Sequence, residues 1–129
     1  MSNKISIICV SGTREKLQMA AMIASVAAAT GSQVSVLFSM NALPHFVKGH
    51  AVDVPFEGEF GELLQRDGVP PFKQLFHQAA ELGDALLLPC SMALDILKPT
   101  KEGLDPALGL PTGLTRFLQD AEGGQLLVF

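Results

Sequence analysis

The sequence contains no tryptophan and no tyrosine among its 129 residues. Sites for sugars and for single-stranded nucleic acids usually use these aromatic side chains, so their absence disfavours both kinds of ligand. Basic residues are also few, with 9 lysines and arginines against 13 acids and a net charge of −4. The chain therefore lacks the positive footprint that nucleic-acid-binding domains carry, and we expect no nucleic-acid partner.

Long hydrophobic runs are absent too. No segment reaches the roughly 18 apolar residues that a membrane-spanning helix needs. The longest candidate, residues 17–30, is interrupted by Gln18 and Ser25. The first residues lead straight into a strand-like run without the pattern of a secretory signal. We therefore expect a cytoplasmic protein without a membrane partner.

Cysteine is limited to Cys9 and Cys90. A reducing cytosol argues against a structural disulfide between them. His45, His50 and His77 show no tight ligand spacing, and a zinc site would need ligands from three separate regions. Neither a GxGxxG motif nor a P-loop is present. We expect no metal and no cofactor, and we expect His77, which lies off the apolar face of its helix, to be solvated.

Short apolar runs alternate with helical patterns along the whole chain. The runs at 4–10, 33–39, 85–88 and 125–129 predict strands, of which the first and third are expected to be buried, and helical periodicity fills most of the intervals. This alternation predicts a single α/β domain over residues 1–129, with helices on both faces of a mostly parallel sheet of about five strands. Residues 50–69 are acidic and broken by glycine and proline, which predicts a mobile loop.

An alanine-rich pattern marks the first predicted helix, over residues 17–30. Alanine side chains permit close approach of a neighbouring surface. We expect that surface to be either the sheet or a second subunit of an oligomer.

The stretch at residues 84–98 suggests where chemistry occurs. A buried strand is predicted to end at Pro89, which cannot donate to a sheet ladder. Cys90 follows, and Ser91 begins a helical pattern. Ligands in open α/β sheets gather beyond the carboxyl ends of the strands. A helix amino terminus also favours the thiolate form of cysteine. We hypothesise that Cys90 is a nucleophile that handles sulfur, with Ser91 and Met92 beside it; the alternative is a buried, inert cysteine.

Other candidates lie near the end of the first strand. Cys9 is most simply a small core residue, but it would be a resolving thiol for Cys90 if the first and third strands are neighbours. Ser11, Gly12 and Thr13 form a turn that opens a helix, where backbone N–H groups are able to hold an anion. A helix cap and tight turn explain the same three residues equally well.

With these residues in hand, the chain resembles the DsrE/DsrF-like family of small sulfur-relay proteins. The likeness lies in the first strand leading into residues 10–13, in residues 37–49, and in the Gly-rich segment before residues 114–118. The most specific part is residues 90–97, CSMALDIL. They resemble the Cys-x-Met-Ser-Met-Asp-Leu-Met stretch of a subgroup associated with sulfur oxidation.

The resemblance implies a three-layer α/β/α fold of flavodoxin-like type, with trimers or hexamers common. It also implies that Cys90 carries sulfur as a persulfide or thiosulfonate, received from a rhodanese-like donor and passed to a TusA-like carrier. Some relatives lack the cysteine and act as structural subunits. The alternative function is therefore a non-catalytic oligomer subunit, or a small-ligand or anion-binding module at the strand carboxyl ends.

Overall fold

The computed structural model describes residues 3–49, 53–100 and 103–129. Its sheet has four parallel strands in the order β3-β2-β1-β4. The bounds are β1 Lys4–Cys9, β2 Gln33–Phe38, β3 Leu86–Pro89 and β4 Gln125–Val128. The predicted α/β architecture with a parallel sheet is confirmed, with four strands rather than about five.

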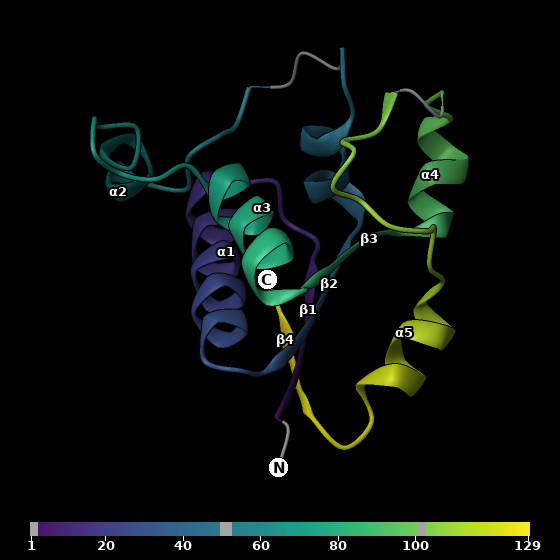
Figure 1. The fold of residues 1–129 in the computed structure, drawn as a ribbon. Helices are drawn as coiled ribbons and strands as arrows, with labels where there is room; N and C mark the ends of the chain where they lie inside the picture. Colours follow the sequence, from purple (N-terminus) through teal and green to yellow (C-terminus); the bar gives the residue numbers. More distant parts are fainter. Residues whose placement is uncertain (1–2, 50–52, 101–102) are drawn as a thin grey trace.

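The helices cover the two faces of the sheet and its carboxyl edge (Figure 1). Helices α1 and α3 lie together on one face, and α5 lies on the other. The 3-10 helix η1 and α4 lie at the end where the strands finish. The bounds are α1 Arg14–Ala29, η1 Met40–Phe46, α2 Glu59–Leu63, α3 Phe72–Gly83, α4 Ser91–Leu97 and α5 Leu114–Ala121.

Strand register separates the side chains of the two faces. Ile7, Val36 and Leu87 lie opposite one another on β1, β2 and β3, so they share a face, and all three are buried. Phe38 belongs to the same face and contacts Phe76 of α3 edge-on, with ring centroids 4.9 Å apart. The face toward α1 and α3 is therefore the main core.

The opposite face is covered less completely. Phe117 of α5 is buried, and Lys4 on this face donates to the Asp120 carbonyl at the end of α5. Leu86 and Val128 share this face at its two edges, yet they are 57% and 60% exposed. One helix is too narrow to cover four strands, so apolar surface remains open on this side.

The alanine-rich face of α1 packs inside the chain. Five of its alanines are buried, at positions 20, 21, 24, 27 and 28. Gly83, at the end of α3, lies so close to Ala28 that a side chain at position 83 would overlap the Ala28 side chain. The small residues therefore serve close packing between α1 and α3, whereas Met19, Met22 and Val26 point outward.

The edge of β3 is closed by the segment around Gly109 and Thr112. Gly109 donates to the Leu87 carbonyl at 2.7 Å, and Thr112 donates to the Pro89 carbonyl at 2.9 Å. Thr112 forms a single parallel bridge with Cys90. This contact stands in the place of a fifth strand. Among the described residues, no helix is long and apolar enough to span a membrane.

Candidate functional site

Cys90 lies where the sequence predicts it. It follows the last residue of β3 and is the N-cap residue of α4, with φ −69° and ψ 124°. Its backbone N–H donates to the Phe38 carbonyl at 2.9 Å, and its carbonyl accepts from Leu94 at 3.0 Å. The backbone of Cys90 is therefore fixed on one side by β2 and on the other by the first turn of α4.

The Cys90 side chain is nearly covered. Its residue is 6% exposed, and it lines none of five cavities, of about 220 to 620 Å³, in the described part of the chain. Ser91, the next residue, donates its N–H to the Thr112 carbonyl at 3.0 Å, while Met92 is 46% exposed. Cys90 thus belongs to the buried core, and its backbone is held by the bridge to Thr112.

Cys9 does not adjoin Cys90. It ends β1 opposite Phe38 of β2, and Phe38 in turn lies opposite Pro89 of β3. Strands two places apart are separated by roughly 10 Å, beyond the reach of a disulfide between fixed backbones. Both cysteines are free. The condition for a resolving role of Cys9, adjacency of the first and third strands, is not met in this sheet.

Burial also suppresses the chemistry of Cys9. Its side chain has no exposed surface, and desolvation raises the pKa of the thiol from 9.0 to about 12. A thiolate in this position would lose its hydration without gaining a compensating charge. Cys9 fits the small core residue that the sequence also allows.

The turn at Ser11, Gly12 and Thr13 is held by contacts within the chain. Ser11 Oγ accepts the Thr13 N–H at 3.2 Å, and Thr13 Oγ1 donates to a carboxylate oxygen of Glu57. A Cβ at Gly12 would overlap the carbonyl oxygen of Asn41. Glycine here permits close packing of the turn against η1, and the N–H groups of Ser11 and Thr13 already have partners.

Glu15 fastens the acidic segment to the start of α1. Its carboxylate accepts the N–H groups of Glu57 at 2.9 Å and Gly58 at 2.7 Å. The hydrogen bond from Glu57 is the largest cause that lowers the pKa of Glu15 from 4.5. The Arg14 N–H donates to the Pro55 carbonyl at 2.9 Å. These contacts surround the first turn of α1 with carboxylates, which is unfavourable for an anion there. The mobility of the segment stays a prediction.

His45 was not selected by its spacing, but the structure places it centrally. It is 6% exposed, and its Nε2 lies 3.1 Å from the Gly12 carbonyl. Because a carbonyl oxygen only accepts, Nε2 carries the proton of this hydrogen bond. His45 separates two cavities. One, of about 360 Å³, adjoins Gly12 and Asp53; the other, of about 400 Å³, adjoins Phe72 and two lysines.

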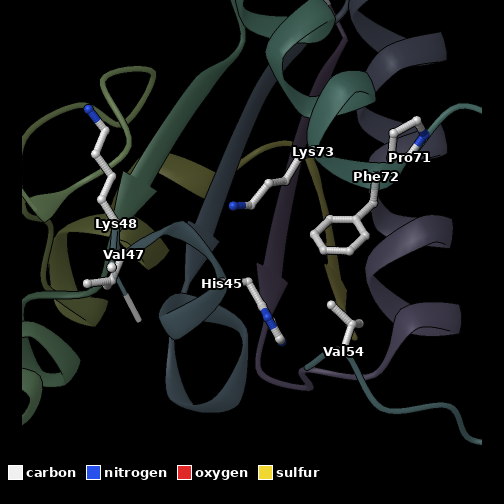
Figure 2. Close-up of a pocket in the computed structure, with 8 residues that line it drawn as sticks. His45, Val47, Lys48, Val54, Pro71, Phe72 and Lys73 are labelled. Carbon is white, nitrogen blue, oxygen red and sulfur yellow. The ribbon is translucent and has the colours of Figure 1, made fainter. Parts of the chain in front are cut away.

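The cavity of about 400 Å³ is lined by two lysines that the sequence analysis missed, Lys48 and Lys73. Figure 2 shows Lys73 of α3 extending between Phe72 and the segment that carries Val47 and Lys48. No sequence motif marks these lysines, because they lie on separate elements. The sequence predicted a solvated His77. In the structure its Nε2 lies 2.8 Å from Asp105 Oδ2. Among the described residues, no group of histidine, cysteine and acidic side chains has the arrangement of a metal site.

Comparison with known proteins identifies the fold. No family model matches the chain, and no curated protein sequence matches it. Among solved structures, the YchN protein from E. coli superposes with a TM-score of 0.63 at 12% identity, covering 100% of both chains. A protein of unknown function from Methanobacterium thermoautotrophicum gives 0.56 at 11% identity, also covering 100% of both chains. Both have the DsrE/DsrF-like fold. At these identities the likeness shows the fold alone.

Proposed function

We propose that this protein is a sulfur carrier of the sulfurtransferase type that holds sulfur on Cys90. The observation that carries the proposal is the position of the thiol, at the carboxyl end of β3 and the N-cap of α4. The DsrE/DsrF-like fold and the likeness of residues 90–97 to the cysteine motif of that family support it. In a reducing cytoplasm, where we place the protein, both thiols would stay free.

The reaction is a thiolate exchange. The Cys90 thiolate attacks the outer sulfur of a donor persulfide, the donor S–S bond breaks, and the donor leaves as a thiolate. Cys90 then carries a persulfide. An acceptor thiolate attacks its outer sulfur, the S–S bond breaks, and Cys90 leaves as a thiolate. With tetrathionate, attack on an inner sulfur releases thiosulfate and leaves a thiosulfonate on Cys90. No external oxidant or reductant is needed for either exchange.

The surface around Cys90 suggests how a partner gains access. Met92 and Ile96 are 46% and 72% exposed, and their spacing of four residues places them on one side of α4. Leu110, on the segment that covers the β3 edge, is 82% exposed. A TusA-like acceptor or a rhodanese-like donor that docks on these side chains would be positioned to break the bridge between Cys90 and Thr112.

Intact-mass measurement tests the proposal directly. After incubation with an organic persulfide, wild-type protein should gain the mass of one sulfur atom, and after tetrathionate the mass of one thiosulfonate group. Cys90→Ser should gain neither. Cys9→Ala is the matched control and should still load once. Loading of Cys90→Ser to the same extent as wild type would contradict the assignment.

A non-catalytic subunit or small-ligand module is the second candidate function. It is favoured by one observation: Cys90 lines no described cavity, whereas two cavities at the strand carboxyl ends adjoin His45. This reading predicts no sulfur adduct in the mass experiment. It predicts instead an increase in melting temperature when a nucleotide or other anion is added.

We also propose that the chain self-associates, as a trimer or hexamer. The support is the apolar surface left open beside α5, where Leu114 and Leu118 are 52% and 43% exposed. Large apolar patches of this kind mark interaction surfaces. Light scattering should show an oligomer for wild type and a smaller species for Leu118→Glu. A wild-type protein that is monomeric at all concentrations would contradict the proposal.

A further inference from the structure

The cavity of about 400 Å³ lies between the end of η1 and the beginning of α3. Its aromatic wall comes from buried side chains: Phe72 is 4% exposed, and its ring lies 6.1 Å from the ring of His45 and 6.4 Å from that of Phe46. Val47 and Val54 add aliphatic surface (Figure 2). Because these aromatic rings belong to the core, the wall is fixed before any ligand arrives.

Positive charge gathers at the same cavity. Lys48 and Lys73 line it, and no acidic residue of the described chain does. The Lys73 ammonium lies 5.5 Å from the centroid of the Phe46 ring, a cation–π distance. The contacts between a basic and an acidic side chain found among the described residues are His77 with Asp105 and Arg116 with Asp120, and neither includes these lysines. In a chain of net charge −4, this is a local excess of positive charge.

An adjoining cavity of about 310 Å³ shares Val47, Lys48 and Lys73 with the first. Asp105 lines this cavity of about 310 Å³, but both of its carboxylate oxygens already have hydrogen-bond partners. Oδ2 lies 2.8 Å from His77 Nε2, and Oδ1 accepts the Ala107 N–H at 2.9 Å. The carboxylate therefore faces its own donors, and the two ammonium groups stay available to a ligand. We refer to the two cavities together as the lysine cleft.

We propose that the lysine cleft binds an organic phosphate, with the phosphate at Lys73, the Lys48 side chain turning inward to meet it, and an apolar or aromatic body against Phe72. Lysine binds phosphate as a mobile point charge, whereas planar carboxylates are more often held by the fork of arginine, which this cleft lacks. The first turn of α3 at Phe72 adds a positive dipole end to the same space. A volume of about 400 Å³ lies within the range of small-molecule sites.

Fluorescence titration with naphthyl phosphate tests this proposal. The chain has no tryptophan or tyrosine, so the signal of the naphthyl group is free of protein background. Wild type should bind naphthyl phosphate, and binding should weaken as salt is added. Lys73→Met and Lys48→Met keep an unbranched apolar side chain but remove the charge. Each should weaken binding by about tenfold or more, as expected for a charge-assisted hydrogen bond.

Matched controls separate the cleft from general charge effects. Lys16→Met makes the same change at an exposed site of α1 outside the cleft and should bind like wild type. Naphthol, which lacks the phosphate, and inorganic phosphate, which lacks the body, should each bind more weakly than naphthyl phosphate. Equal losses in Lys16→Met and Lys73→Met, no binding by wild type, or equal binding of naphthol would overturn the proposal.

The cleft is independent of the proposed sulfur carrier, because Cys90 lines neither of its cavities. Cys90→Ser should bind naphthyl phosphate with wild-type affinity while losing the sulfur adduct. Failure of either experiment therefore leaves the other result standing.

Discussion

A central strand and an edge strand of the sheet both lead to a cysteine at their carboxyl ends, yet the two thiols have different environments. Cys9 ends β1, which has β2 on one side and β4 on the other. Cys90 follows β3, an edge strand closed only by the segment around Gly109 and Thr112. Both lie at the carboxyl ends of strands, where α/β proteins place their chemistry. The comparison shows that thiols at two strand ends differ in burial with strand position: Cys9 on the central strand has no exposed surface, whereas Cys90 at the edge is 6% exposed.

The largest expected effect is a difference in thiol reactivity. At a pKa of about 12, near pH 8 only about one Cys9 side chain in ten thousand is a thiolate. Native protein treated with iodoacetamide should therefore be modified only very slowly at Cys9, and faster at Cys90. Peptide mapping at several time points measures both rates. In denaturant the two rates should converge, and faster labelling of Cys9 in the native state would reverse the comparison.

Glycine substitutions should show the same contrast in stability. Gly12→Ala places a methyl group against the Asn41 carbonyl at the central end of the sheet, and it should lower the free energy of unfolding by about 1–3 kcal/mol. Gly113→Ala, near Cys90, meets only Ser91 Oγ at 3.6 Å, so its expected cost is that of a poorer N-cap residue for α5, about 0.5–1 kcal/mol. Urea denaturation of both variants provides the measurement. Equal losses would show that the edge is as tightly packed as the centre.

The smallest effect concerns Glu15, which fastens the acidic segment near the central strand. Its pKa is lowered in the folded protein, so its carboxylate stabilises the fold above the ordinary pKa of 4.5 and loses that contribution as pH falls below it. Glu15→Gln should melt slightly below wild type at neutral pH, and the gap should close in acid. Melting temperatures measured across the pH range test this. Glu81→Gln removes an exposed carboxylate on α3 and serves as the control.

Much of the fold was predictable because its signals are local. Apolar runs marked all four strands, and Pro89 marked the end of β3 where the ladder stops. The start of α1 was placed too late, at Leu17 instead of Arg14, because the first turn of the helix is polar and adds nothing to the apolar periodicity. Propensity and pattern describe a segment by itself, and these elements depend mainly on their own residues.

The candidate site was predictable only in part, because it depends on pairing between distant segments. No feature of β1 or β3 states that β2 lies between them, so the distance between Cys9 and Cys90 was undetermined. His77 and Asp105 are 28 positions apart and meet only through the packing of α3 against the loop. Lys48 and Lys73 likewise line the same cavities only because of the tertiary structure. The sequence therefore identified a candidate that consists of one residue, Cys90. It did not identify candidates that need residues from two different elements.

The contact between Gly83 and Ala28 has a mechanical consequence. With no room between the ends of α1 and α3, this pair of helices forms a stiff block against the sheet. Any motion that uncovers Cys90 must then take place on the opposite side of the molecule. We expect it in α4 and in the segment around Gly109 and Thr112 that covers the β3 edge. A spectroscopic label for following such motion belongs on that side, with its reference label on the outer surface of α1.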